Sequence, residues 1–360
     1  MFLTSKLPLV AVDIGSHSIK LAQLRLSRDR YELVNFGIMP LEPETIVDGS
    51  IKDIDRVTET LSSLVKAEGV KSRYAIASVS GEAVIIKKIK MPTMSQEELS
   101  EKILEEAEEY IPFDIDDVTM DFQILRQPGQ ISGAMDDPES NDKMEVLLVA
   151  VQREIIEARM EILEGAGLKP VIMDLDVFAM MNAVNMAENL EHRGCVILLD
   201  LGSSFTNINI VNNGFTHFTR DFRFGGLQCT GKLQAEFKIS PEEADEFKRG
   251  NIPDSVDEEL VKKIIIESFN PIIEEVKNSI SGFENLENCS VDQAFLTGGG
   301  ALLNGVDRLF ADQLGIATEI FNPFQNIKVD LKKFDAESVA ELAPLTTVAL
   351  GLAARKFDYT

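Results

Sequence analysis

The chain has 360 residues, 44% of them hydrophobic, and its mean hydropathy is zero. This length corresponds to about two to three ordinary domains with large cores, which excludes a globally disordered chain. Asp and Glu (60) outnumber Lys and Arg (35), so the net charge is −25 and the isoelectric point is about 4.5. Such a surface repels phosphate backbones and anionic lipid, and we expect neither nucleic acid nor a bilayer as a direct partner.

Targeting signals and cysteine pairs are not evident in the sequence. No apolar run approaches the ~18 residues of a membrane-spanning helix, and residues 1–15 lack the apolar core and cleavage site of a signal peptide. Cys195, Cys229 and Cys289 are far apart and match neither a disulfide framework nor metal-ligand spacing. We therefore expect a cytoplasmic protein with no direct membrane insertion.

Hydrophobic periodicity predicts strands and helices in alternation at the start of the chain. The predicted elements are strands at 9–12, 19–26 and 74–79 and a helix at 54–67. Gly69 directly follows the helix, as expected of a residue that ends one.

A unit with a different order of elements begins after Gly81. Its predicted elements are a strand at 83–89, a helix opened by Ser95, strands at 118–125 and 144–151, and a helix at 154–164. Ser95 and Glu98 form a capping box, which is typical of a helix start. The segment 126–143 is rich in Gly, Pro, Ser and Asp, so it is predicted to be a loop, and its role stays open. We expect residues 83–167 to form an inserted strand–helix–strand–strand module.

The remaining chain again alternates strands with helices, which predicts an α/β fold. The predicted elements are strands at 170–173, 195–201, 207–211 and 293–297, and helices after Asp176, within 232–288, at 302–314 and at 338–355. We expect a first half made of residues 1–82, 168–194 and 338–360. The second half would be residues 195–337, with a helical subdomain at about 232–288.

Two segments repeat one pattern, VAVDIGSHSIK at 10–20 and LLDLGSSFTNI at 198–208. Each is an apolar strand ending in Asp-x-Gly-Ser, then a turn and a second strand. Such a turn presents backbone N–H groups and small side chains to a phosphate. Asp13 and Asp200 suit Mg²⁺ bound through water, and Lys20 can neutralise a phosphate. One copy is an ordinary hairpin. Two copies predict a duplicated domain that holds a polyphosphate between its halves.

A third glycine-rich segment, FLTGGGALLNGV at 295–306, joins a predicted strand to a helix. Its glycines let a base or ribose pack flat, and a helix N-terminus favours anionic groups. A flexible connection is the alternative. The P-loop and the Gly-x-Gly-x-x-Gly fingerprint do not explain these glycines, because neither is present.

The two Asp-x-Gly-Ser hairpins and the late triple glycine together resemble the actin-like ATPase superfamily. Within it, KMPTMSQEELSEKILEEAEEYIPFDIDDVTMDFQIL at 90–125 is similar to the corresponding stretch of the PilM family of type IV pilus assembly proteins, itself similar to FtsA. The Tyr-Ile-Pro-Phe segment at 110–113 is its most specific part. The resemblance covers essentially the whole chain and implies the actin-like ATPase fold, two α/β halves around a nucleotide cleft.

The resemblance also implies a site for ATP and Mg²⁺. The first phosphate loop would be Asp13, Gly15, Ser16, Ser18 and Lys20. The second would be Asp200, Gly202, Ser203, Ser204 and Thr206, with Gly225 and Gly226 running beside it. The adenosine loop would be Gly298, Gly299 and Gly300, and the metal would be held through water by Asp13 and Asp200.

Two further segments match the superfamily less closely. The helix EEADEFK at 242–248 would place Asp245 and Lys248 at the purine and ribose, although relatives have Glu where this chain has Asp245. A solvated acidic helix is the alternative. Asp176 falls where hydrolysing relatives place the catalytic group that orients the attacking water. It can equally cap the helix that follows, the interpretation we favour.

By this resemblance we expect an ATP-binding scaffold of the type IV pilus machine, with weak or no ATPase activity. A PilN-like inner-membrane protein would recruit it to the inner face of the inner membrane through its cytoplasmic N-terminal tail, bound beside the inserted module. Candidates for core packing first and contact with the tail second are Ile103, Leu104, Tyr110, Ile111 and Phe113.

Several alternatives stay open. The chain lacks the basic amphipathic tail that FtsA-like proteins carry after the last helix, which favours the pilus family. An FtsA-like filament former, an ATPase with real turnover and a small-molecule kinase are the other functions considered. Contacts with pilus motor ATPases, and a homo-oligomer or ring, are also left open.

Overall fold

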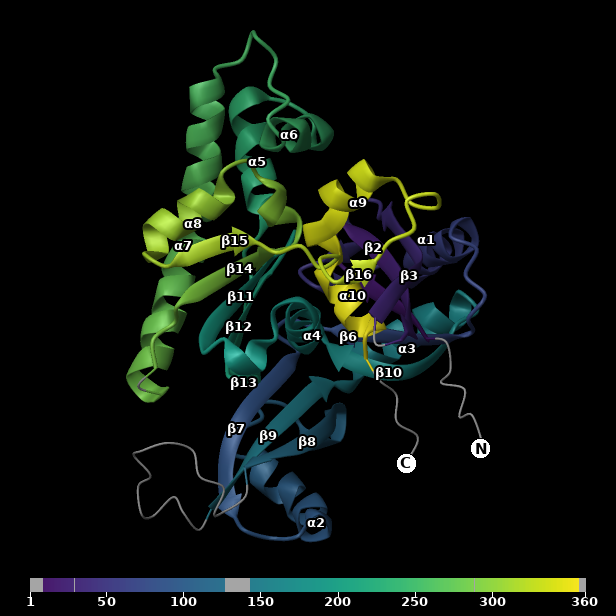
Figure 1. Cartoon of the computed structure of the whole chain (residues 1–360), viewed down its shortest axis with the longest axis vertical. Helices are drawn as coiled ribbons and strands as arrows, with labels where there is room; N and C mark the ends of the chain where they lie inside the picture. Colours follow the sequence, from purple (N-terminus) through teal and green to yellow (C-terminus); the bar gives the residue numbers. More distant parts are fainter. Residues whose placement is uncertain (1–8, 29, 127–142, 288, 356–360) are drawn as a thin grey trace. The chain divides into compact units, whose positions relative to one another are not determined.

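The structure is a computed structural model that describes residues 9–28, 30–126, 143–287 and 289–355. The chain divides into two compact units, Met1–Gly81 with Met160–Thr360, and Glu82–Arg159. The larger unit contains two mixed sheets with helices, and the smaller one contains a three-stranded sheet with helix α2 (Figure 1). The predicted α/β class is therefore confirmed.

The first sheet of the larger unit has the strand order β10-β6-β1-β2-β3-β16. Its strands are β1 (Leu9–Ile14), β2 (Ser18–Ser27), β3 (Arg30–Pro40), β6 (Tyr74–Val79), β10 (Lys169–Leu175) and β16 (Ile327–Lys328), and a small hairpin of β4 (Ile46–Val47) and β5 (Ser50–Ile51) follows β3. β1, β2 and β3 are antiparallel, whereas β6 and β10 extend the sheet in parallel.

β1 is apolar at successive positions because both faces of the sheet are covered. Val12 lies in one core with Leu61 of α1 (Ile54–Ala67). The preceding residue, Ala11, lies on the other face of the sheet, in another core with Leu352 of α10 (Thr347–Ala353). The end of β1 is therefore fixed from both sides.

The second sheet repeats this arrangement, with the strand order β13-β12-β11-β14-β15. Its strands are β11 (Cys195–Leu201), β12 (Thr206–Asn212), β13 (Phe215–Phe222), β14 (Gln293–Thr297) and β15 (Ala317–Ile320). β11, β12 and β13 are antiparallel, and β14 and β15 again continue in parallel. Every strand of the first sheet except β16 thus has a counterpart in the second sheet, as the repeated hairpin sequences predict for a duplicated α/β fold.

The helices of the larger unit connect and cover these sheets. Besides α1, they are α4 (Asp176–Glu188), α5 (Gly226–Phe237), α6 (Pro241–Lys248), α7 (Glu258–Glu287), α8 (Val306–Leu314), α9 (Ala336–Leu342) and α10. The predicted single helix at 338–355 is wrong. A 3₁₀ turn at Ala343–Thr346 separates α9 from α10, because Pro344 cannot donate the hydrogen bond that would continue the helix.

The smaller unit has the predicted strand–helix–strand–strand order. Its elements are β7 (Val84–Pro92), α2 (Gln96–Ala107), β8 (Val118–Arg126) and β9 (Lys143–Gln152), with β9 in the middle of an antiparallel sheet. The capping box of Ser95 and Glu98 is present. Leu99 and Ile103 of α2 pack in one core with Leu148 of β9.

The smaller unit ends at Arg159 and not at the expected residue 167. Helix α3 (Arg153–Gly165) continues past that point, and its Ile162 and Leu163 lie in the core of the first sheet with Val57. The last turns of α3 therefore belong to the larger unit. Of the predicted loop at 126–143, residues 127–142 lie outside the described residues.

Over the described ranges, none of the helices combines the length and the apolar composition needed to cross a bilayer.

A glycine fixes the packing of α10 against α4, and its replacement is a direct test of the fold. A Cβ at Gly351 would lie 1.8 Å from the carbonyl oxygen of Ala179. We expect Gly351→Ala to lower the free energy of unfolding by about 1–3 kcal/mol, because backbone must move. Gly282→Ala in α7 is the matched control, since a Cβ there meets nothing within 4 Å. It should stabilise by up to about 1 kcal/mol. Denaturant unfolding compares them, and equal effects would contradict the contact.

Candidate functional site

The turn between β1 and β2 encloses the ammonium group of Lys20. Asp13 and Lys20 are directly opposite in the register of the two strands, and Lys20 Nζ lies 3.3 Å from Asp13 Oδ2. The Gly15 N–H donates to the Ser18 carbonyl (3.2 Å), and a Cβ at Gly15 would lie 2.8 Å from Lys20 Nζ. Glycine at this position therefore leaves the space in which the ammonium group sits.

The turn between β11 and β12 is built in the same way. The Gly202 N–H donates to the Phe205 carbonyl (2.9 Å). The Thr206 hydroxyl donates to the Phe224 carbonyl (2.9 Å), so it is engaged within the protein. The Ser204 hydroxyl is buried and has no hydrogen-bond partner in the described part of the chain. A buried hydroxyl at the tip of a turn is a group that a ligand can satisfy.

Charged groups from both turns act on Asp200. Enclosure by protein raises the pKa of its carboxyl to about 7, Lys20 opposes this shift, and Asp13 adds to it. Lys20 and Asp13 belong to the first turn and Asp200 to the second, so the two predicted phosphate loops lie within electrostatic range of each other. A further cation between them would favour the ionised form of Asp200.

Two more carboxylates, Asp176 and Asp221, belong to the same cluster. Asp176 is the first residue of α4, whose N-cap is Leu175 without a side-chain cap bond, so the favoured interpretation of Asp176 as the cap is wrong. Its charge instead raises the pKa of both Asp200 and Asp221, although burial is the larger cause for each. The sequence analysis missed Asp221, because it did not predict β13.

The three consecutive glycines after β14 have different structural roles. Gly298 has φ +80° and ψ 178°, a conformation essentially restricted to glycine, and a Cβ there would lie 2.1 Å from Asp200 Oδ1. A Cβ at Gly300 would lie 2.6 Å from the Cβ of Leu201. Gly299 is exposed, and a Cβ there would meet only Leu345, at 3.5 Å. Gly298 and Gly300 therefore pack the loop against the second turn, and Gly299 is the one open to solvent.

Helix α5 begins at the second turn. The Gly226 N–H donates to the Gly202 carbonyl (3.0 Å), and the Leu227 N–H donates to the Ser203 carbonyl (2.9 Å). A Cβ at Gly225 would lie 2.5 Å from the same Gly202 oxygen. The Gly225–Gly226 segment thus runs beside the second turn, as the resemblance implies.

Helix α6 carries the two remaining predicted residues. Lys248 Nζ lies 2.6 Å from Asp245 Oδ1 and donates to the Thr230 hydroxyl (2.8 Å) on α5. His17, at the tip of the first turn, has a pKa lowered mainly by burial, raised by Asp245 and lowered by Lys248. The first turn and α6 therefore lie within electrostatic range of each other.

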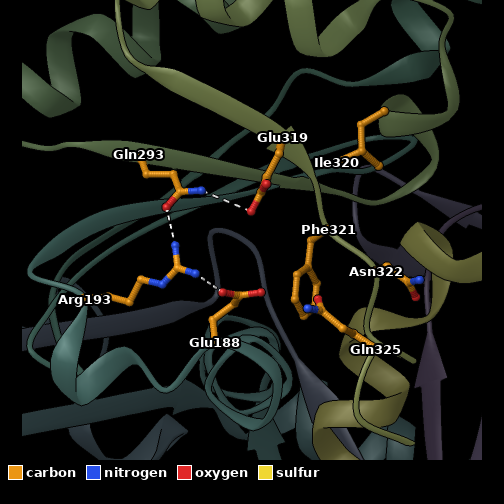
Figure 2. A pocket seen from close by; sticks show the side chains of 8 residues that line it. All are labelled: Glu188, Arg193, Gln293, Glu319, Ile320, Phe321, Asn322 and Gln325. Atoms are coloured by element: carbon orange, nitrogen blue, oxygen red, sulfur yellow. Dashed lines mark hydrogen bonds and ion pairs between the residues drawn. The ribbon is translucent and has the colours of Figure 1, made fainter.

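A separate pocket of about 290 Å³ is visible in Figure 2. It is lined by Glu188, Arg193, Gln293, Glu319, Ile320, Phe321, Asn322 and Gln325. Arg193 donates to Glu188 and to Gln293 (2.7 Å), and Gln293 donates to Glu319 (3.0 Å). Its main polar groups bond to one another, and it includes none of the predicted loops.

Comparison with known proteins identifies one family whose model covers nearly the whole chain. The model of the family described as type IV pilus assembly protein PilM matches residues 11–357. The cell division protein FtsA of Bacillus subtilis is 24% identical over 355 residues, which cover 87% of this chain and 78% of that protein.

Solved structures with similar folds agree with this match. A chain in the structure of a PilM–PilN type IV pilus biogenesis complex has a TM-score of 0.84 and 26% identity, and the alignment covers 97% of this chain and 98% of that one. MreB5 of Spiroplasma citri, solved with ADP and with AMPPNP, has a TM-score of 0.52 and 14% identity over 96% of this chain and 94% of its own. The expected actin-like ATPase fold is confirmed.

The different roles of the glycines generate a prediction. We expect Gly298→Ala to lower the free energy of unfolding by about 1–3 kcal/mol, since it combines a strained φ with a clash against Asp200. Gly299→Ala, one residue away, should change it by less than about 0.5 kcal/mol. Denaturant unfolding of the two variants measures the difference. A larger loss in Gly299→Ala would show that the loop packs differently.

Proposed function

Because the chain belongs to the PilM family of type IV pilus assembly proteins, we propose that it is a nucleotide-binding scaffold with two ligands. One is ATP with Mg²⁺, and the other is the cytoplasmic tail of a PilN-like inner-membrane protein. The observation that carries the proposal is the likeness, over 97% of this chain, to a chain of a PilM–PilN complex. In this proposal the protein works in the cytoplasm and is recruited to the inner membrane by that partner.

The residues of the two turns fit a nucleotide polyphosphate. Lys20 is held at the base of the first turn in a space that Gly15 leaves, and the unpartnered Ser204 hydroxyl lies at the tip of the second. Ser16, Ser18 and Ser203 complete the small polar side chains of the turns. A nucleotide held by both turns would fix the relative orientation of the two halves, because its contacts favour one arrangement.

The carboxylates favour a nucleotide that arrives with a cation. Asp13 and Asp200 would repel a bare polyphosphate, whereas the ammonium group of Lys20 lowers the pKa of Asp200 against the effects of burial and Asp13. Mg²⁺ bound with ATP would neutralise phosphate charge and reach these carboxylates through its water ligands. Gly299, on the exposed side of its loop, and the Asp245–Lys248 pair would lie toward the adenosine.

The smaller unit would receive the tail of the partner. Ile103 and Ile111 are buried in its core, whereas Leu104 and Tyr110 are exposed and free to contact another chain. Helix α2 also carries exposed glutamates, among them Glu101 and Glu105. Cytoplasmic segments next to membrane helices are enriched in Lys and Arg, so their charge complements this surface.

The nucleotide part of the proposal is tested with Lys20→Ala. The variant removes a charge that would meet a phosphate, so we expect Mg·ATP to bind at least about tenfold more weakly, a loss of about 1.4 kcal/mol. Lys262→Ala on α7 is the control, because that lysine pairs with Glu258 and Glu259 at an exposed site. Isothermal titration measures both, with and without Mg²⁺. Equal affinities in the two variants would remove Lys20 from the site.

The partner part is tested with a fluorescent peptide that carries the first dozen or so residues of the candidate inner-membrane protein. We expect saturable binding to the full chain and at least about tenfold weaker binding to a Leu104→Ser/Tyr110→Ser variant, since buried apolar contacts are lost. Leu286→Ser is the control, because Leu286 is also an exposed apolar residue but lies on α7 of the larger unit. No binding to the unmodified chain would contradict the proposed partner.

A further inference from the structure

Asp221 bridges two segments of the larger unit that are far apart in sequence. One carboxylate oxygen accepts from Asn207 Nδ2 (2.7 Å), and the other accepts from the backbone N–H of Gly81. Asn207 is paired with Asp200 in the β11–β12 register, so this side of the bridge is anchored next to the predicted phosphate turn. The other side is the residue at which the chain leaves the larger unit, because the smaller unit begins at Glu82.

Phe205 makes a second contact between the same two segments. It lies in the turn between Ser204 and Thr206, and an ideal Cβ on Gly81 would be 3.8 Å from its ring. A Cβ at Gly49, in the turn between β4 and β5, would be 3.0 Å from the same ring. The Arg223 guanidinium carbon lies 6.0 Å from the ring centroid and its Nη1 is 3.5 Å from Asp48 Oδ2. The ring is therefore held among three segments.

The conformation of Gly81 makes this junction sensitive to both contacts. Its φ is +96°, which side-chain-bearing residues rarely adopt, and it is buried. Only Ser80 separates it from the last residue of β6, and β7 begins at Val84. A shift of its peptide group would thus be passed directly to the first strand of the smaller unit.

We propose that Asp221 and Phe205 couple ligand binding at the second turn to the junction at Gly81, and so to the smaller unit. The inference rests on the proposed nucleotide site. A phosphate bound by the Ser203–Ser204 part of the turn orders the neighbouring Phe205, whose ring supports Gly81. Asp221 acts as a positioning residue, since it ties the Gly81 N–H to the strand pair that carries Asp200. Ligand binding then reduces the opening of the chain at the start of β7.

The test is hydrogen–deuterium exchange of the full chain with and without Mg·ATP. We expect nucleotide to slow exchange in peptides that cover residues 79–92, and Asp221→Asn to lose most of this effect. The amide of Asn can accept from only one of the two donors, so one side of the bridge is lost. Exchange is compared at saturating nucleotide for every variant, so that a change in affinity is not read as a loss of coupling.

Two more variants make the outcome decisive. Phe205→Leu keeps an apolar side chain but removes the ring edge at Gly81, so it should also lose the slowing of exchange by nucleotide. It tests the proposal even if Asp221→Asn does not fold. Lys262→Ala is the control, since it changes an exposed ion pair on α7 that the proposed coupling does not use, and it should keep the effect.

The possible results separate this inference from the proposed function. Unmodified protein that binds Mg·ATP with no change at residues 79–92 overturns the coupling alone. Full protection in both Asp221→Asn and Phe205→Leu overturns it as well. Protein that binds no nucleotide overturns the proposed site, and the coupling with it. Loss of protection in these two variants, with protection kept in Lys262→Ala, is the supporting result.

Discussion

The second half of the molecule depends on one close approach of backbones at Leu201–Ser203. The carbonyl groups of this turn meet the start of α5 and the loop after β14, and each meeting occurs at a glycine. A Cβ would lie 2.5 Å from the Gly202 oxygen at Gly225 and 2.8 Å from the Leu201 oxygen at Gly298. No larger residue fits at either contact without backbone movement. The turn is therefore fixed in place by segments from three parts of the sequence.

This constraint explains the unusual electrostatics of the site. Packing the loop against Asp200 removes water from the carboxyl and raises its pKa to about 7. Lys20, on the first turn of the other half, supplies a positive charge that opposes this shift. Charge therefore links the two halves, in addition to the backbone bonds between β16 and β3 and between Gly298 and Pro344. A ligand that adds a cation and an anion together suits such a site better than either ion alone.

Pro344, between α9 and α10, supports the loop after β14 through hydrogen bonds to its carbonyl oxygen. Pro344 breaks the helix that its sequence otherwise predicts, and the break leaves its carbonyl free to accept from the Gly298 N–H (2.9 Å) and the Thr297 hydroxyl (2.7 Å). The end of the chain, part of the expected first half, thus positions a loop of the second. A helix-breaking residue here is a structural part of the candidate site.

Sequence reasoning succeeded where one local pattern determines the outcome. β6 and α1 have the predicted bounds of 74–79 and 54–67, because an apolar strand and an amphipathic helix follow from periodicity alone. It failed where contacts between segments far apart in the sequence determine the structure. The end of the smaller unit at Arg159 depends on where Ile162 packs, and the bridge by Asp221 needs β13, which was not predicted. The roles of the predicted nucleotide-binding residues stay predictions.

The most direct test of the account is a crystal structure of the full chain with AMPPNP and Mg²⁺. The account predicts phosphate density between the Gly15–Ser18 and Gly202–Ser204 turns, with Lys20 Nζ within hydrogen-bond distance of a phosphate oxygen and the base on the side of Gly299 and α6. Nucleotide density elsewhere, for example in the pocket beside Arg193, with the space between the two turns empty, would contradict it.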